Sequence, residues 1–139
     1  MPTRTSTARW QGSLKDGAGN MRLASGAYEG SFSYLSRFES GEGTNPEELI
    51  AAAHAGCFSM ALSNVLGKAG LTPNSIETSA TIHLDMPAGI TKVELSTVGD
   101  VPGLSEADFI KHAEDAKANC PVSKALAAIE ITLTAKLAS

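Results

Sequence analysis

The sequence is poor in cysteine, in aromatic residues and in positive charge. Of its 139 residues only two are cysteine, aromatic residues make up 5%, and 11 Lys and Arg stand against 15 Asp and Glu. The net charge of −4 and the absence of a basic stripe argue against binding to nucleic acid or to anionic membranes. The length and the 42% of hydrophobic residues predict a single globular domain over residues 1–139.

The sequence also lacks the usual signals for export or membrane insertion. Residues 1–12 contain no apolar core of a signal peptide. No apolar run reaches the roughly 20 residues that a membrane-spanning helix needs. We therefore expect a soluble cytoplasmic protein. In that compartment a structural disulfide is not expected, so the cysteines should be reduced and either catalytic, metal-bound or idle.

The two cysteines occupy different local patterns. Cys57 lies in an apolar run over residues 49–62, whereas Cys120 directly precedes Pro121. They are 63 positions apart (120 − 57), which excludes a local CxxC redox pair. They can still meet in the fold and alternate between dithiol and disulfide, as in a thiol peroxidase.

The hydrophobic pattern predicts an α+β chain. The expected strands cover residues 3–12, 21–28, 31–38, 76–86, 90–100 and 129–137. Asn45 is the expected N-cap of a long helix that begins at Pro46 and runs to about residue 69, where Gly70 ends it. Ser105 and Cys120 are the expected caps of two further helices.

The long helix is apolar on all sides. Between residues 49 and 62 its only strongly polar side chain is His54. A helix of this kind is buried, and a chain of 139 residues has few elements with which to surround it. A second copy of the chain, packed against the small residues of the helix, would bury it as a homodimer. The alternative is a helix enclosed by the sheets of its own chain.

Four segments carry a recognisable combination of motifs. They are RFE at 37–39, GTNPEEL at 43–49, AAHAGCFSMAL at 52–62 and CPVSKAL at 120–126. Together they resemble the OsmC/Ohr family of organic hydroperoxide peroxidases, and its OsmC branch more than its Ohr branch. The resemblance implies an OsmC-like α+β fold, with antiparallel sheets wrapped around a long buried central helix in an intertwined homodimer.

The resemblance also implies a set of site residues and partners. By motif position, Cys57 matches the peroxidatic cysteine and Cys120 the resolving one, while Arg37 and Glu47 match the residues that activate the thiol. The substrate would be an organic hydroperoxide, and a dithiol such as a lipoylated protein would reduce the Cys57–Cys120 disulfide. Neither a metal nor an organic cofactor is implied.

The chemistry of these residues can be argued independently. Cys57 is about three turns into its helix, where burial raises the pKa of a thiol, so its thiolate needs a cation such as Arg37. Glu47 could hold that guanidinium in place. Cys120, as a helix N-cap, should be the more acidic thiol. Each residue also has an ordinary structural interpretation: a packed Cys57, a solvated strand residue at Arg37 and a carboxylate at a helix start.

The histidines suggest two other kinds of site, a histidine base for Cys57 and a zinc site. His54 precedes Cys57 by three residues on one helix face and could act as its base, but a packed, hydrogen-bonded neutral histidine is the stronger interpretation. A zinc site is disfavoured because closely spaced ligand pairs are missing. The pocket walls near Cys57 are expected from Phe58, Met60 and Leu62. The alternative function is a non-enzymatic dimeric module that binds an apolar ligand or partner in the same cleft.

Helix geometry places a constraint on the expected site. Glu47 and Cys57 are ten residues apart, which corresponds to roughly 15 Å along a helix axis and roughly 80° around it. One straight helix cannot bring both side chains to the same guanidinium. We therefore expect active sites that combine Glu47 of one chain with Cys57 of the other.

Overall fold

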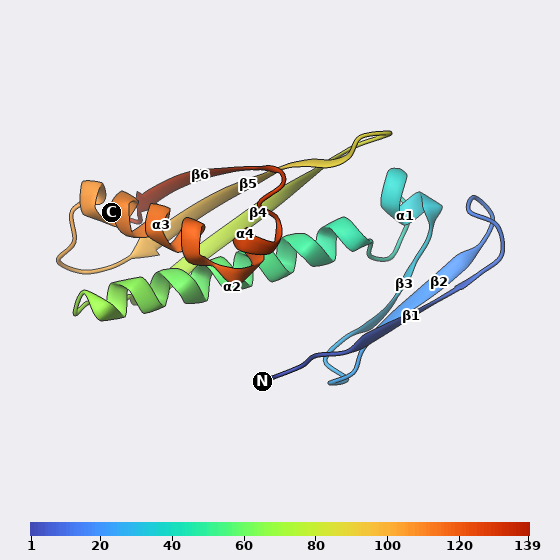
Figure 1. The fold of residues 1–139 in the computed structure, drawn as a ribbon, viewed down its shortest axis with the longest axis horizontal. Helices are drawn as coiled ribbons and strands as arrows, with labels where there is room; N and C mark the ends of the chain where they lie inside the picture. The colour runs from blue at the N-terminus through green and yellow to red at the C-terminus, as the bar shows by residue number, and fades with distance from the viewer. The chain divides into compact units, whose positions relative to one another are not determined.

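The chain folds into two compact units. The computed structural model describes all 139 residues, and residues 1–49 form unit 1 while residues 50–139 form unit 2. Figure 1 shows the elements of each unit along the chain. The α+β class expected from the sequence is confirmed. The single domain expected over residues 1–139 stays a prediction.

Unit 1 is built on a small antiparallel sheet. Its strands are β1 (Ser6–Gln11), β2 (Ala18–Leu23) and β3 (Glu29–Phe32), in that spatial order. The short helix α1 (Tyr34–Phe38) follows. The expectation of a strand over residues 31–38 is therefore wrong, and Arg37 lies on a helix.

Serine side chains explain why this segment turns into a helix. The Ser33 hydroxyl accepts a hydrogen bond from the Ser36 backbone N–H at 3.1 Å, and the Ser36 hydroxyl accepts one from the Ser33 N–H at 2.8 Å. This is a reciprocal capping box with serine in the place where glutamate or glutamine is usual. Because Ser36 is not a usual capping-box residue, the sequence pattern does not indicate that a helix begins here.

Unit 1 contains no buried hydrophobic side chain. Its buried residues are all polar or charged: Ser36, Thr44 and Glu47. Most residues of β1 are exposed on both faces of the strand. The 49-residue unit therefore has no apolar core of its own, which is the main source of stability in ordinary domains.

The long helix α2 (Pro46–Lys68) begins and ends as the sequence predicts. The Asn45 side chain accepts a hydrogen bond from the Glu48 N–H at 2.7 Å, which is the expected N-cap. Gly70 has a φ of +81°, the left-handed conformation that stops a helix. The Glu48 carboxylate accepts from the Thr44 hydroxyl at 2.8 Å rather than closing a capping box.

Only one stripe of α2 is buried within the chain. After the buried Glu47 of the first turn, the buried residues recur every fourth position: His54, Phe58, Leu62 and Leu66. Between the charged Glu48 and Lys68 at its two ends, the exposed residues of the helix are mostly small: Ala52, Ala53, Gly56, Met60, Ser63, Asn64 and Gly67. A helix surrounded by its own chain is therefore not observed.

The apolar length of α2 exceeds the sequence expectation. The helix is long and apolar enough to cross a membrane by length and composition, with a mean hydropathy of 1.5 in its most apolar 18-residue window. This corrects the expectation that no apolar run reaches the length of a membrane span. A single such helix is weak evidence for a membrane span, because the core helices of soluble proteins meet the same criterion.

Unit 2 combines the rest of α2 with a mixed sheet. The sheet has the order β4 (Ser75–Asp85), β5 (Gly89–Asp100) and β6 (Glu130–Leu137). The first pair is antiparallel, whereas β5 and β6 are parallel, so the sheet is not wholly antiparallel as expected. The parallel pair arises because two helices separate β5 from β6 in sequence.

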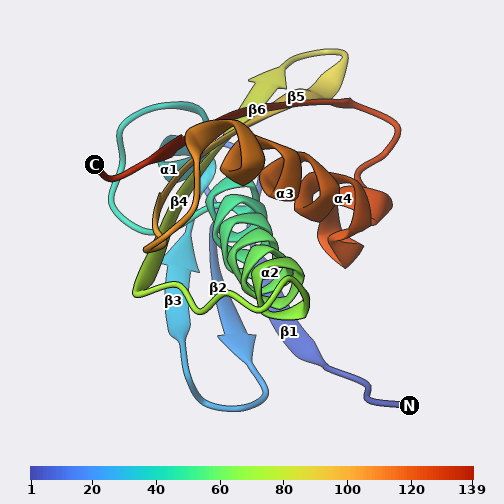
Figure 2. The ribbon, with the colours of Figure 1, turned by 90° about the vertical axis from the view of Figure 1, so that its left-hand side faces the viewer.

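Those two helices are α3 (Glu106–Asn119) and α4 (Pro121–Ala125). Helices α2 and α3 cover the same face of the sheet, as the two ribbon views show (Figures 1 and 2). The Phe109 ring of α3 lies against Gly99 of β5, where an added Cβ would come within 2.5 Å of the ring. Glycine at this position allows the helix to pack closely on the strand, and Phe109 joins the same buried core as Cys120.

Candidate active site

Cys57 and Cys120 meet in unit 2 despite their separation in sequence. Their sulfur atoms are 3.0 Å apart and both cysteines are free thiols. Cys57 lies in the middle of α2, and Cys120 lies at the junction between α3 and α4. A disulfide needs sulfur atoms about 2.05 Å apart, so a movement of about 1 Å joins the two.

The two thiols differ in their access to solvent. Cys120 has no exposed surface, whereas Cys57 is partly exposed and lines a cavity of about 910 Å³. Unit 2 supplies all the lining residues, from α2, α3 and the start of α4. A molecule entering this cavity reaches Cys57 first.

The cavity walls differ from the sequence expectation. Met60 lines the cavity as expected, but Phe58 and Leu62 are fully buried in the core. Their spacing on α2 directs them toward the sheet, on the opposite side from Met60. The further apolar lining residues are Ala61, Val65, Ala69, Ala116 and Pro121. Lys68 and Asp115 add charge to the lining.

The two thiols also differ in acidity. Burial raises the pKa of Cys57, and its hydrogen bond with Cys120 raises it further. Burial acts in the same direction on Cys120, but the polar groups of Cys57, Ser123 and Val122 around its sulfur outweigh burial and lower the pKa of that thiol. The structure agrees with the expectation that Cys120 is the more acidic cysteine.

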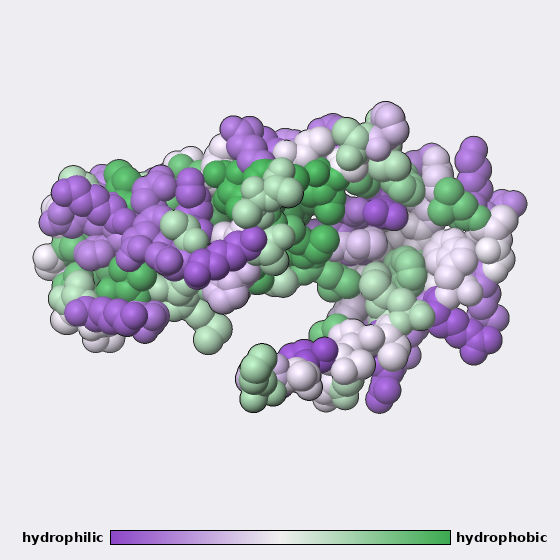
Figure 3. Space-filling model, in the orientation of Figure 1, coloured by the Kyte–Doolittle hydropathy of each residue, from purple (hydrophilic) through white to green (hydrophobic).

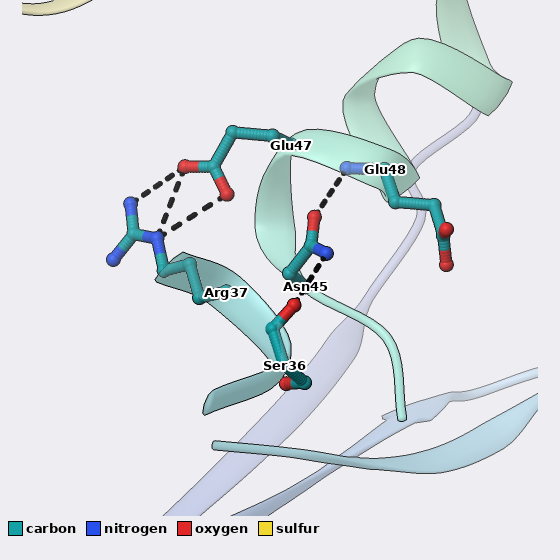
Figure 4. Close-up of polar contacts among 5 residues, drawn as sticks. All are labelled: Ser36, Arg37, Asn45, Glu47 and Glu48. Atoms are coloured by element: carbon teal, nitrogen blue, oxygen red, sulfur yellow. Dashed lines mark hydrogen bonds and ion pairs between the residues drawn. The ribbon is translucent and has the colours of Figure 1, made fainter. Parts of the chain in front are cut away.

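Arg37 and Glu47 form an ion pair in unit 1. The Arg37 Nη2 and Nε donate to Glu47 Oε1 at 2.7 and 3.1 Å, and Nε also lies 3.2 Å from Oε2 (Figure 4). The Glu47 side chain is 10% exposed and that of Arg37 37%. These bonds leave Nη1 of the guanidinium for another acceptor. The expectation that Glu47 holds this guanidinium is consistent with the geometry.

A set of hydrogen bonds fixes α1 against the first turn of α2. The Asn45 Nδ2 donates to the Ser36 carbonyl oxygen at 2.9 Å while its Oδ1 caps α2 (Figure 4). The Ser36 hydroxyl donates to the Thr44 carbonyl at 2.7 Å. Because Arg37 follows Ser36 and Glu47 lies in the first turn of α2, these bonds set the two charged side chains opposite each other. The sequence indicated Asn45 as a cap but not this second role.

His54 does not serve as a base for Cys57. It is fully buried, and its Nε2 lies 2.7 Å from the Ser123 hydroxyl on α4. Burial lowers the pKa of His54 and keeps the ring neutral. The interpretation of a packed, hydrogen-bonded histidine is confirmed. Ser123 itself was missed, because a serine in a short helix carries no signal of its own.

The surface over the cysteine region differs from its surroundings. On the face shown in Figure 3, hydrophilic side chains cover α3, whereas hydrophobic ones gather around α4 and the adjoining part of α2. No group of three or more His, Cys, Asp and Glu side chains is placed to hold a metal ion. The site is therefore a thiol pair beside a partly apolar cavity.

Sequence comparisons identify relatives along almost the whole chain. Residues 39–134 match the family model described as OsmC-like protein. The chain is 49% identical to the Peroxiredoxin OsmC of Escherichia coli over 136 residues, which cover 95% of this chain and 94% of the relative. It is 35% identical to the Organic hydroperoxide resistance protein of Xanthomonas axonopodis pv. citri over 98 residues, which cover 68% of each.

Solved structures show the same fold. The crystal structure of an organic hydroperoxide resistance protein from Elizabethkingia anophelis superposes with a TM-score of 0.78 at 26% identity, covering 99% of this chain and 97% of that one. An OsmC-like protein from Mycoplasma pneumoniae gives a TM-score of 0.74 at 16% identity, with 99% of both chains covered. The resemblance and the OsmC-like fold expected from the sequence are confirmed.

Proposed function

Because the chain belongs to the OsmC family, we propose that it is a thiol-dependent peroxidase that reduces organic hydroperoxides to alcohols. The observation that carries this function is the 3.0 Å contact between two free thiols, one of which lines a cavity while the other is buried behind it. In this arrangement a peroxide can reach the Cys57 sulfur, and the buried Cys120 sulfur can then form a disulfide with it. Proteins that use thiols only for packing have no need of such a pair.

The first step takes place at Cys57. Its thiolate attacks the terminal oxygen of the hydroperoxide, the O–O bond breaks, and the alkoxide leaves and is protonated to the alcohol. The sulfur is oxidised to sulfenic acid and the peroxide is reduced by two electrons. The partly exposed position of Cys57 in the cavity supports its assignment as the attacking thiol.

The second step joins the two cysteines. The Cys120 thiolate attacks the Cys57 sulfur, the S–S bond forms, and the S–O bond breaks to release hydroxide, which is protonated to water. The contact between the two sulfur atoms in the reduced protein means that this step needs little rearrangement.

A dithiol then restores the enzyme. Because Cys120 is buried, the incoming thiolate attacks the sulfur of Cys57 and releases Cys120, whose lowered pKa makes it the better leaving group. The second thiol of the reductant completes its own disulfide and carries away two electrons in total. A lipoylated protein is the partner we propose, because its two linked thiols suit this sequence. A dithiol-dependent enzyme fits the cytoplasm, where thiols are kept reduced.

Arg37 and Glu47 complete the proposed active site. The raised pKa of Cys57 leaves little thiolate at neutral pH, so a cation is needed at that sulfur. The Arg37 guanidinium is permanently charged and retains donors beyond those that bind Glu47. Glu47 orients the guanidinium, and Arg37 binds the Cys57 thiolate and the peroxide oxygen.

We further propose that the enzyme is a homodimer. Unit 1 lacks a buried hydrophobic residue, and the small residues along α2 remain exposed in the single chain. Both features are accounted for by a second copy that packs against the exposed side of α2 and covers the sheet of unit 1. Small side chains allow two helices to approach closely, which favours a helix pair at the interface.

The decisive experiment measures peroxide consumption and thiol state together. With cumene hydroperoxide and dihydrolipoamide, the wild type should turn over, and Cys57→Ser should be inactive. Cys120→Ser should undergo one oxidation at Cys57 without forming a disulfide. As a matched control, Ser59→Ala removes a hydroxyl from α2 that bonds Thr78 rather than either cysteine, and it should turn over normally.

The outcomes separate the peroxidase from the alternative function. Alkyl and aryl hydroperoxides should exceed hydrogen peroxide in kcat/KM, because the apolar part of the cavity lining beside Cys57 takes up a hydrocarbon group at little desolvation cost. A non-enzymatic module would bind apolar molecules without oxidation of either thiol. Wild-type protein that shows neither turnover nor a Cys57–Cys120 bond in peptide mapping would rule out the proposed cycle.

A further inference from the structure

Aromatic residues are scarce in this chain, and more than half of them line one cavity. The sequence contains one Trp, two Tyr and four Phe residues. Four of these seven line a cavity of about 240 Å³ within unit 1: Trp10, Phe32, Tyr34 and Phe38. The other lining residues are Leu14, Ser33, Arg37 and Pro46. We call this cavity the aromatic pocket, and it shares no lining residue with the cavity at Cys57.

Strand pairing places two of the rings side by side. In the sheet of unit 1, Gly19 of β2 pairs with Trp10 on one side and with Phe32 on the other. Because directly paired residues point to the same face of a sheet, both rings lie on the face that the glycine leaves bare. Their centroids are 5.4 Å apart, and a Cβ on Gly19 would lie 2.5 Å from the Phe32 ring. The Trp10 Nε1–H donates to the Gly12 carbonyl oxygen at 3.1 Å, which satisfies the one polar atom of this apolar wall.

Helix α1 adds a second wall and the one charged group of the aromatic pocket. Tyr34 and Phe38 are four residues apart, which places them on one helix face, and their ring centroids are 5.0 Å apart. The guanidinium carbon of Arg37 lies 5.1 Å from the centroid of the Phe38 ring, within the range of a cation–π contact. Glu47 binds the same guanidinium through Nε and Nη2 (Figure 4). Arg37 is therefore held at the wall of an otherwise uncharged pocket.

On the basis of the proposed function, we propose that the aromatic pocket binds the organic group of the hydroperoxide and selects aryl over alkyl groups. In the proposed mechanism Arg37 binds the peroxide oxygen, and the organic group is bonded directly to the O–O pair. That group therefore lies within a few bonds of the Arg37 guanidinium, which itself lines the aromatic pocket. The pocket volume of about 240 Å³ lies below the roughly 300–1,000 Å³ of pockets that hold drug-sized ligands, so its occupant is compact.

The aromatic pocket and the cavity at Cys57 contribute differently to selectivity. The apolar part of the lining beside Cys57 accepts any hydrocarbon group and so favours organic hydroperoxides over hydrogen peroxide. Aromatic walls add a preference among organic groups, because two aromatic rings attract each other in offset or edge-to-face contact beyond the effect of apolar burial. Cumene hydroperoxide differs from tert-butyl hydroperoxide by a phenyl ring in place of one methyl group. The aromatic pocket therefore favours cumene hydroperoxide.

The kinetic experiment compares these two substrates. The ratio of kcat/KM for cumene hydroperoxide to that for tert-butyl hydroperoxide should fall about tenfold or more in Trp10→Ala, because even one methylene contact in an apolar pocket is worth about tenfold. Trp10→Phe keeps a ring and should retain much of the ratio. Tyr28→Ala removes a partly exposed ring of unit 1 that does not line the pocket, and it should keep the wild-type ratio. An equal loss toward both substrates in Trp10→Ala, or an unchanged ratio, would overturn the proposal.

Ligand binding can be measured in the wild type without peroxide, and so apart from the proposed function and from the folding of any variant. Trp10 is the only tryptophan of the chain, so its fluorescence reports on the aromatic pocket. Titration with 2-phenyl-2-propanol, the alcohol formed from cumene hydroperoxide, should change this fluorescence until it saturates. The smaller alcohol tert-butanol should act much more weakly, because it has no ring to place against the aromatic walls.

The outcomes of this titration separate the possible occupants of the pocket. A fluorescence signal that both alcohols change alike, or that neither changes, would overturn the proposal. A signal that responds to dilution of the protein and not to 2-phenyl-2-propanol would show that a second copy of the chain fills the pocket, which overturns the proposal as well. Saturable binding of 2-phenyl-2-propanol by a protein that consumes no peroxide would support the aromatic pocket and count against the peroxidase.

Discussion

Cys57 and Cys120 both carry a thiol, but their surroundings shift the pKa values of the two thiols in opposite directions. Cys57 lies in the interior of α2, where burial raises the pKa of its thiol and the nearby Val122 backbone does not offset that rise. Around Cys120 the polar groups of Cys57, Ser123 and Val122 outweigh burial and lower the pKa of that thiol. Cys120 is therefore the thiol of the pair that ionises first, and Cys57 the one that holds its proton longer. The attacking sulfur must be activated by a group outside the pair, and this is the role that we propose for Arg37.

The first residue-level prediction concerns that activation. Arg37→Ala should raise the pKa of Cys57 and slow its oxidation at pH 7 about tenfold for each unit of the shift. Arg37→Lys should recover only part of the rate, because an ammonium group lacks the planar fork that binds Glu47 and a second acceptor together. The measurement is the pH profile of Cys57 alkylation in a Cys120→Ser background. The control is Arg22→Ala, which removes an exposed arginine from unit 1. The same alkylation profile in Arg37→Ala, in Arg22→Ala and in the protein with both arginines would refute the activating role of Arg37.

The second residue-level prediction concerns stability below neutral pH. The pKa of folded His54 lies below its ordinary value of 6.5 because the ring is buried, whereas the unfolded chain titrates near 6.5. As the pH falls below 6.5, the unfolded state binds the proton first, and the free energy of unfolding decreases. Above pH 6.5 this contribution is fully present.

Urea unfolding between pH 5 and pH 8 measures the effect. The wild type should lose stability from pH 6.5 downward, and His54→Gln should show a flatter dependence although it is less stable overall. Ser59→Ala, which removes a hydroxyl that does not ionise from the same helix, should keep the wild-type slope. The same slope in His54→Gln and in wild type would assign the pH dependence to other groups.

At the scale of elements, the N-caps of α2 and α3 make a matched pair. Asn45 accepts from the Glu48 N–H at 2.7 Å and Ser105 from the Asp108 N–H at 3.2 Å. Loss of either cap by substitution with alanine should cost about 1 kcal/mol of stability. Only Asn45→Ala also frees the Ser36 carbonyl and loosens Arg37 against Glu47. We expect reduced kcat/KM in Asn45→Ala and normal kcat/KM in Ser105→Ala, measured beside chemical unfolding. Equal activities would show that the cap does not position the arginine.

The elements also show what could be predicted from the sequence. Asn45, Pro46 and Gly70 determine the ends of α2 through local chemistry, and the structure places them as predicted. Helix α1 was missed because its capping box uses Ser36, a residue that is equally common in loops. A short helix can be predicted from its local sequence only when its capping residues are those usually found at helix ends.

Contacts between distant segments were harder to predict. The parallel pairing of β5 with β6 depends on how α3 and α4 return the chain, which strand patterns do not specify. The family motifs named Cys57 and Cys120, but only the fold shows His54 bonded to Ser123. Phe58 and Leu62 were assigned to the pocket because hydrophobicity alone does not tell a core face from a cavity face.

At the scale of the whole molecule, Gly56 tests the proposed dimer. A Cβ at this position would meet nothing within 4 Å in the single chain, so Gly56→Leu should fold without strain and should favour the helix. If two copies of α2 pack along this side, the added side chain separates them. Sedimentation should show monomers for Gly56→Leu and dimers for Ala118→Leu, a small-to-large change at an exposed position of α3. Dimers in both variants would place the interface elsewhere.

Mixed subunits test whether each active site uses two chains. Suppose that Glu47 of one chain acts on Cys57 of its partner. In a heterodimer of one Cys57→Ser chain and one Glu47→Ala chain, both substitutions then fall in the same active site, and the other active site keeps both native residues. Roughly half of the wild-type activity per dimer is then expected, because a twofold dimer has two equivalent sites. Activity no higher than that of the two inactive parents, with heterodimers confirmed by mass, would show that each chain supplies its own Glu47.

The absence of an apolar core in unit 1 has a consequence for how the protein is made. Unit 2 holds all of the buried hydrophobic side chains and can collapse as soon as its own residues are available. In the proposed homodimer, unit 1 gains its stabilising burial from the second chain, so its ordering is tied to the encounter of two chains. Refolding should begin with a step whose rate does not depend on protein concentration and end with one that does. On this proposal, newly synthesised chains pass through a stage in which the thiol pair has formed but Arg37, the residue proposed to activate it, is not yet in place.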